Sequence, residues 1–207
     1  MKLLRTLVLL AGTVFGVIQP AAAEDLVSRL KAHLGAEQIL GLALWGVSTE
    51  TNPLVVVISS SPVEGSGGQP IGIGSQLRVF RDTGSTVHLI SKLDPRAAPL
   101  SQFLVSEVDG LMVTTWVTAS AFRTIVLHYV ASEKQVKVSL EVGSKGLPEI
   151  LYPFTHGNVL ALTIQDYRPG TIGLPSADTP TTVYLFNEMG DHTETHTTWS
   201  ERFSLLR

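Results

Sequence analysis

The stretch Val126-Leu-His-Tyr-Val-Ala-Ser-Glu-Lys-Gln-Val-Lys-Val-Ser139 carries the pattern that decides the fold class of this chain. An apolar run ends shortly after the aromatic Tyr129, a short polar segment follows, and apolar and polar residues then alternate up to Ser139. Alternation with a period of two is typical of a β-strand, and a short polar segment between two such runs is typical of a hairpin turn. The stretch is therefore predicted to be a β-hairpin.

The same pattern recurs along most of the chain after Ile39. Leu77 to Ile90 and Val183 to His196 are two more segments in which an apolar strand reaches an aromatic residue before a polar turn. Short runs rich in β-branched and aromatic residues, separated by Gly, Pro, Asn or Asp, predict twelve strands in all. These strands are predicted at 40–47, 54–60, 75–81, 86–92, 102–108, 112–118, 123–131, 135–141, 149–154, 159–166, 182–187 and 193–199. Two stretches rich in Gly and Pro, Ser60 to Pro70 and Arg168 to Pro180, are predicted to be loops.

One helix is predicted before the strands, over Glu24 to Leu34. Leu26, Leu30 and Leu34 recur there at helical spacing, and Gly35 stands where a left-handed cap would end the helix. No other helical pattern interrupts the strands, which argues against a parallel sheet with crossover helices. The predicted fold is all-β: an antiparallel meander with one short N-terminal helix, arranged either as an incomplete propeller or as a two-layer sandwich.

The first residues predict export from the cytoplasm. Lys2 and Arg5 precede an apolar run from Leu7 to Ile18, and the small residues Ala21-Ala-Ala23 follow. The run is shorter than the roughly 20 residues that an ordinary membrane-spanning helix needs, and the alanines match a signal-peptide cleavage site. Residues 1–23 are therefore predicted to be a signal peptide, with an uncleaved anchor as the alternative, and residues 24–207 to be a single β domain. The protein is expected to be periplasmic or secreted, without stable membrane insertion after cleavage.

Charge and cysteine content narrow the classes of function. The chain has a formal net charge of −3 at pH 7, and its densest basic pair is Arg78 and Arg81. Nucleic acids are bound through clustered Lys and Arg, so no nucleic-acid partner is predicted. The chain contains no cysteine, which excludes disulfides, a thiol nucleophile and thiolate metal sites. The fold must therefore rest on its core. An exported chain without cysteine fits a bacterial periplasm or a secreted bacterial product best.

The segment Glu141-Val-Gly-Ser-Lys-Gly-Leu-Pro-Glu-Ile150 has the outline of a calcium-binding turn between two strands. Together with the hairpin pattern it resembles the repeats of FG-GAP and VCBS-type β-propeller proteins, in which an acidic loop closes on Pro-Glu-Ile before a new strand. The resemblance covers at most Leu77 to Trp199 and implies a propeller-like repeat. Glu141, Gly143 and Lys145 stand where that family places three oxygen ligands, so two ligands are missing. Because Ca²⁺ takes about six to eight oxygens, the turn is predicted to keep the shape of the site without the ion.

His192, Glu194 and His196 form the most metal-like group in the sequence. Alternate residues of a strand point to one face, so these three would bring two imidazoles and a carboxylate together. Zinc is commonly bound by such ligands, which makes a metal-dependent hydrolase or another metalloenzyme the alternative function. The intervening threonines are equally typical of a strand that is packed on its other face, with the His and Glu side chains in water. No cofactor is predicted, and a divalent metal ion on this strand face is the alternative.

Trp199, Arg202 and Phe203, near the C-terminus, are the candidate binding residues. Trp and Arg are enriched among the residues that dominate binding energy at protein interfaces. The alternative is that these side chains lock the last strand onto the sheet. No catalytic residue is predicted, since the chain has neither a Gly-x-Ser-x-Gly elbow nor a phosphate-binding loop.

The predicted function is therefore an exported, non-catalytic binding or interaction module with a protein partner in the cell envelope. The metalloenzyme of the His192/Glu194/His196 face is the first alternative. The second is a structural component of an envelope assembly, in which a partner strand extends an edge of a sheet.

Overall fold

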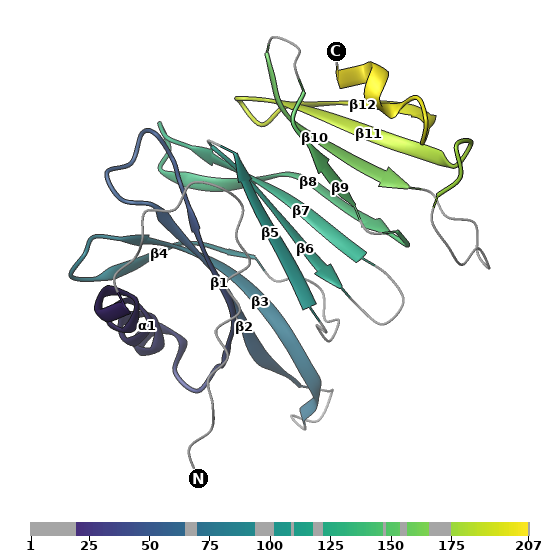
Figure 1. Cartoon of the computed structure of the whole chain (residues 1–207). Coiled ribbons are helices and arrows are strands. Elements are labelled where there is room, and N and C mark those ends of the chain that lie inside the picture. Colours follow the sequence, from purple (N-terminus) through teal and green to yellow (C-terminus); the bar gives the residue numbers. More distant parts are fainter. Residues whose placement is uncertain are drawn as a thin grey trace.

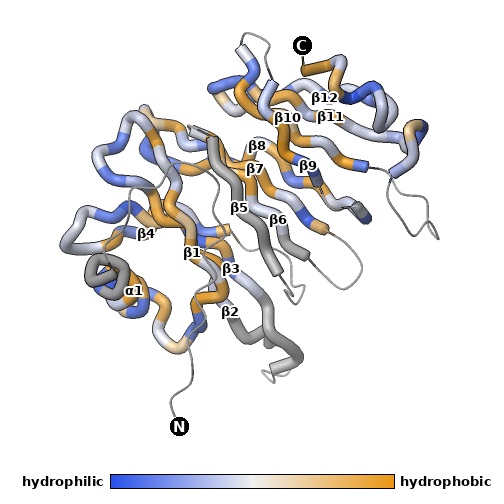
Figure 2. Tube along the Cα trace, viewed as in Figure 1, coloured by the Kyte–Doolittle hydropathy of each residue, from blue (hydrophilic) through white to orange (hydrophobic). Residues whose placement is uncertain are grey.

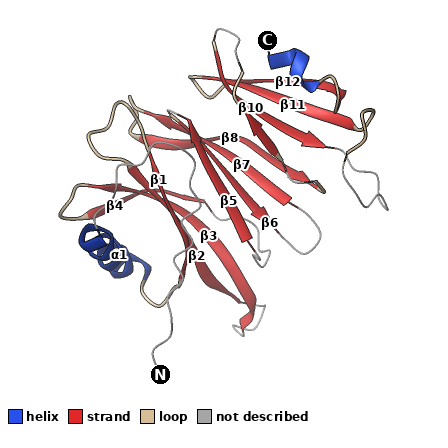
Figure 3. Cartoon of the chain, viewed as in Figure 1, coloured by secondary structure: helices blue, strands red, loops and turns tan. Residues whose placement is uncertain are grey.

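The computed structural model of the chain describes residues 20–64, 70–93, 102–108, 110–117, 122–146, 148–153, 157–165 and 175–206. These described residues form one α-helix, twelve strands and one short 3₁₀ helix (Figure 3). The elements are α1 (Pro20–Leu34), β1 (Ile39–Trp45), β2 (Leu54–Glu64), β3 (Pro70–Asp82), β4 (Val87–Leu93), β5 (Gln102–Val108), β6 (Leu111–Val117), β7 (Phe122–Val130), β8 (Gln135–Ser144), β9 (Glu149–Leu151), β10 (Asn158–Gln165), β11 (Pro180–Asn187), β12 (His192–Thr198) and η1 (Arg202–Leu206).

The strands form three four-stranded sheets, in which strands that are consecutive in the chain pair antiparallel. We call them sheet A (β1–β4), sheet B (β5–β8) and sheet C (β9–β12). Figure 1 shows the sheets stacked face to face in chain order, with α1 on the outer face of sheet A and η1 on the outer face of sheet C. The predicted all-β antiparallel meander with one N-terminal helix is confirmed. Three sheet layers are present in the described chain, one more than a two-layer sandwich has.

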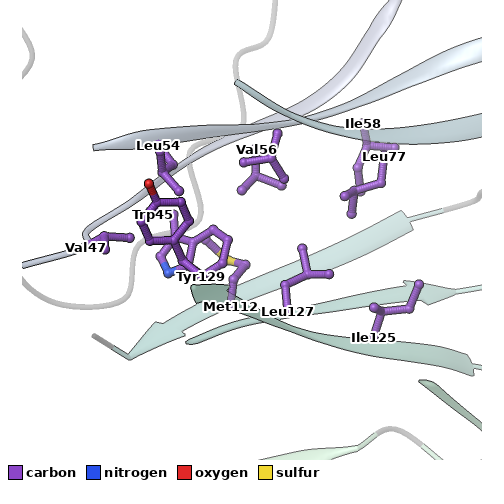
Figure 4. Packing of buried hydrophobic residues seen from close by; sticks show 11 residues of the cluster. Trp45, Val47, Leu54, Val56, Ile58, Leu77, Met112, Ile125, Leu127 and Tyr129 are labelled. Atoms are coloured by element: carbon purple, nitrogen blue, oxygen red, sulfur yellow. The ribbon is translucent and has the colours of Figure 1, made fainter. Parts of the chain in front are cut away.

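Apolar side chains fill each space between neighbouring layers, which is why the layers stack. Sheets A and B enclose a cluster that includes Trp45, Leu77 and Leu127, and Figure 4 shows these two layers facing each other. Sheets B and C enclose a second cluster around Val126 and Phe186. In Figure 2 the orange of hydrophobic residues runs along strands that border these two spaces. Burial of such side chains stabilises the fold by about 1.5–3 kcal/mol each, so the stack depends on both inter-sheet cores.

The three hairpins that share one sequence pattern occupy the same place in the three sheets. They are the third and fourth strands: β3–β4, β7–β8 and β11–β12. The aromatic residues in the first strand of each hairpin all point toward the preceding layer of the stack. Tyr129 of sheet B packs toward sheet A, and Phe186 of sheet C packs toward sheet B. Phe80 of sheet A packs toward α1. The helix therefore stands where a preceding sheet would lie.

Helix α1 caps the outer face of sheet A. Leu26, Leu30 and Leu34 are buried against Val55, Val57 and Phe80, among others. The predicted end of the helix is confirmed, because Gly35 has a φ of +60° and its N–H donates to the carbonyl of Lys31 at 3.0 Å. The helix begins earlier than predicted, at Pro20. Proline suits the first helical turn, since its missing N–H would have no partner there.

The loop predicted at Ser60 to Pro70 is wrong in part. Strand β2 continues to Glu64, and Glu64 pairs with Pro70 at the start of β3. Ile71 and Ile73 alternate with glycines in this segment, which continues the period-two pattern of a strand although half of its positions carry no side chain. Residues 65–69 lie outside the described residues. Of the second predicted loop, Arg168 to Pro180, the part up to residue 174 also lies outside the described residues.

Candidate functional site: the C-terminal cap and the inter-sheet contacts

The three candidate binding residues at the C-terminus lie together in the structure. The guanidinium of Arg202 is 3.4 Å from the centroid of the Trp199 ring and 3.9 Å from that of the Phe203 ring. Its Nε donates to Oε2 of Glu149 at 2.8 Å, and Nη1 donates to the carbonyl of Trp199. We call Glu149, Trp199, Arg202 and Phe203 the C-terminal cap. Glu149 belongs to β9, so this cap joins the chain end to the first strand of sheet C.

Burial within the C-terminal cap is uneven. Arg202 is 6% exposed, whereas Phe203 is 47% exposed. A buried arginine that is paired with a carboxylate and stacked on two rings holds those rings in place. The neighbouring Leu205 and Leu206 pack on the outer face of sheet C. The cap therefore presents one aromatic ring to solvent from a rigid base.

The strand with the metal-like pattern does not assemble its three side chains. Oε1 of Glu194 lies 3.4 Å from Nε2 of His196 on the exposed side of β12. The ring of His192 instead packs against Tyr184 and Phe186, with centroids 5.7 and 5.2 Å apart. Among the residues that the structure describes, no group of three or more His, Cys, Asp or Glu side chains is arranged to hold a metal ion.

In the calcium-like turn, the acidic residue Glu141 is paired with an arginine. Glu141 lies on β8 and forms an ion pair with Arg123 on the neighbouring strand β7. Its carboxylate is thus neutralised by a cation of the protein itself.

A polar network that the sequence analysis did not single out connects sheets A and B. Glu50, in the loop between β1 and β2, accepts hydrogen bonds from Arg81 of β3 at 3.0 and 3.1 Å. Arg81 also donates to the hydroxyl of Tyr129 on β7 at 2.6 Å, and that hydroxyl donates to Glu50. Burial alone would raise the pKa of Glu50, but the hydrogen bonds from Tyr129 and Arg81 outweigh it and hold this pKa below its usual value. We call these three residues the A–B network.

The turn between β11 and β12 contacts sheet B directly. A Cβ on Gly190 would lie 2.6 Å from Cγ of His128 and 2.7 Å from Oγ of Ser139, so only a glycine fits between them. The backbone of Gly190 has a φ of +79°, which also favours glycine. Asn187 shapes the turn, because its Oδ1 accepts the N–H groups of Met189 and Asp191 at 2.9 and 3.0 Å. We call residues 187–191 the B–C turn.

Burial beneath the B–C turn perturbs His128. Removal from water lowers the pKa of His128, the nearby Asp191 opposes this shift, and Lys137 adds to it. The net direction is downward, so the contact with Gly190 is made by a neutral imidazole at neutral pH.

A hollow of about 280 Å³ lies between α1 and sheet A. Leu26, Leu44 and Val55 contribute to its apolar wall. The arginine at its rim, Arg29, donates to both carboxylate oxygens of Asp82 at 3.0 and 2.9 Å and pairs with Asp25 as well. Its charge is therefore already satisfied, and the ion pairs serve to fasten α1 to the sheet.

No protein-family model, no curated protein and no solved structure matches this chain. The described helices include none with the length and apolar character of a membrane span.

Proposed function

We propose that this protein is an exported, non-catalytic interaction module, and that it contacts a protein partner of the cell envelope through the C-terminal cap. The observation that carries the proposal is the half-exposed Phe203 ring above a buried, fully paired Arg202. An aromatic side chain that is already fixed loses little conformational entropy on binding. Aromatic residues, Phe among them, and Arg are enriched in protein–protein interfaces relative to the rest of the surface.

The test replaces Phe203 with a photoreactive phenylalanine in cells that make the protein. Leu89 is the matched control position, because it is also 47% exposed but lies on sheet A. We expect a discrete crosslinked species of higher mass from position 203 and none from position 89. Equal crosslinking from both positions, or none from 203, would count against the cap as a contact site.

Export is also a proposal, and it rests on the sequence of residues 1–23. All the leucines that fasten α1 to sheet A follow Ala23, so cleavage after this residue would leave the helix docked. The protein purified from the envelope fraction is then expected to begin at Glu24. A mature chain that keeps residues 1–23 would contradict cleavage.

We further propose that the three sheets are copies of one propeller-type repeat with degenerate FG-GAP or VCBS-type turns. The common position of the three hairpins and the common direction of Phe80, Tyr129 and Phe186 support this. Relatives that carry acidic residues at positions 143 and 145 would strengthen the proposal. Relatives without the hairpin pattern in all three sheets would weaken it.

A further inference from the structure

Strand β1 differs from every other edge strand in the composition of its sequence. The three sheets have six edge strands, namely β1, β4, β5, β8, β9 and β12. Strand β1 reads Ile-Leu-Gly-Leu-Ala-Leu-Trp and contains no charged residue, no histidine and no proline. Each of the other five contains Lys, Glu or His. Charged residues on an edge prevent pairing with another sheet, so β1 alone lacks this protection.

The geometry of β1 suits the addition of a strand. From Gly41 to Trp45 it pairs with β2 in unbroken register, and the one irregularity lies before Gly41. No described strand pairs with its other edge. Glycine inside a strand also permits close approach of another backbone, and Gly41 stands at the start of the regular segment. Five residues in register are about the length of an ordinary strand in a sheet.

Both faces of β1 border an apolar cluster that is incompletely covered. Leu42 and Leu44 are partly buried beside the core under α1. Ala43, on the opposite face, is partly buried beside the core between sheets A and B. A strand added at β1 would extend both clusters, so it must be apolar on both faces and uncharged. Leu40, just before the regular segment, is 44% exposed.

We propose that two copies of this protein associate through β1, strand against strand, so that two sheets A form one continuous sheet. The added strand must be uncharged and apolar on both faces, and it must have an unpaired edge. Among the described edge strands, β1 itself meets these requirements. Antiparallel pairing of a strand with its own copy is a two-fold contact, which closes at a dimer and does not grow into a fibre. This surface is separate from the C-terminal cap, and it goes beyond the proposed function.

Sedimentation equilibrium of the purified protein tests the dimer. Leu40→Lys places a charge beside the edge, and we expect it to weaken dimerisation by about tenfold or more. Leu89→Lys is the matched control, since Leu89 has nearly the same exposure on β4 at the opposite edge of sheet A. It is expected to leave the dimer unchanged, as is Phe203→Ser. A wild-type monomer at every concentration, or equal weakening by the two lysine variants, would overturn the proposal.

A second measurement leaves the edge uncharged. The chain has no cysteine, so Leu40→Cys and Leu89→Cys can each carry a single nitroxide spin label. We expect a short distance between the two labels of a dimer at position 40 and a much longer one at position 89. A short distance at position 89 instead would assign the interface to β4 and contradict the proposal.

Discussion

The interface between sheets A and B and the interface between sheets B and C are closed by different means. Both have an apolar core, but the first is also joined by the hydrogen-bonded A–B network of Glu50, Arg81 and Tyr129. The second is joined by the steric fit of Gly190 against His128. His128 and Tyr129 are neighbours on β7, so their side chains point to opposite faces of sheet B. Strand β7 of the central sheet therefore makes both contacts, through Tyr129 with sheet A and through His128 with sheet C.

The comparison shows how two interfaces of one stack can respond to different changes. A network of charged hydrogen bonds is sensitive to removal of one member, because the others are left unpaired in a partly buried place. A close fit is sensitive to added volume, because the packed side chains have nowhere to move. The two interfaces can therefore be weakened separately.

The largest effect is expected for Gly190→Ala. A left-handed backbone costs a residue with a Cβ about 1–2 kcal/mol, and overpacking adds about 1–3 kcal/mol. We expect the free energy of unfolding, measured by urea denaturation, to fall by about 3 kcal/mol. The control is Gly84→Ala, since Gly84 has a φ of +86° and nothing within 4 Å of an added Cβ. It should lose only the backbone part, and equal losses in the two variants would show that the fit to His128 is not tight.

A smaller effect is expected for Glu50→Ala, which leaves Arg81 and the hydroxyl of Tyr129 without their acceptor. The loss in the free energy of unfolding should be about 2 kcal/mol, since hydrogen bonds to charged groups contribute about 1.5–3 kcal/mol. Glu133→Ala is the control, because the pair between Glu133 and Lys137 is exposed. Its loss should stay below about 1 kcal/mol. If Glu50→Ala costs no more stability than Glu133→Ala, the A–B network does not stabilise this interface.

The smallest effect is expected in the pH dependence of the free energy of unfolding, and it arises from His128. Its pKa is lowered from 6.5 in the folded chain, so below pH 6.5 the unfolded state binds more protons. Stability is then fully present above this pH and is lost as the pH falls toward the folded pKa. The loss should be about 1 kcal/mol or less, and His128→Gln should abolish it in denaturation curves between pH 7 and 5. The matched control is His88→Gln, at an exposed position on β4. A curve that His128→Gln does not flatten would contradict the assignment.

Much of the fold follows from local sequence, whereas the contacts between sheets do not. Period-two alternation located all twelve strands to within a few residues, apart from the extension of β2 to Glu64 and of β3 back to Pro70, where the abundance of Ser, Gly and Pro predicted a loop instead. The helix was found from its leucines, but its start at Pro20 was not. Alternation describes one strand and its two faces. It carries no information on which sheet lies against which face.

The candidate sites show the same division. The sequence indicated Trp199, Arg202 and Phe203, which do lie together, but it did not indicate Glu149, which is 53 residues from Arg202 along the chain. Glu50 and Tyr129 are 79 residues apart, so no local pattern could connect them. Gly190 and Gly84 both lie in tight turns with a positive φ, and the close contact of Gly190 with His128 and Ser139 of sheet B appears only when the sheets are packed together.

Amide hydrogen exchange of Gly190→Ala and Glu50→Ala, each compared with wild type, tests most directly whether the two interfaces are held separately. Local opening speeds exchange in the segment that opens and leaves the rest protected. We expect Gly190→Ala to speed exchange in β11 and β12 and to leave β1 to β3 unchanged, and Glu50→Ala to do the reverse. Faster exchange of the same amides to the same extent in both variants would show that the stack opens as one unit, and would contradict separate closure of the two interfaces.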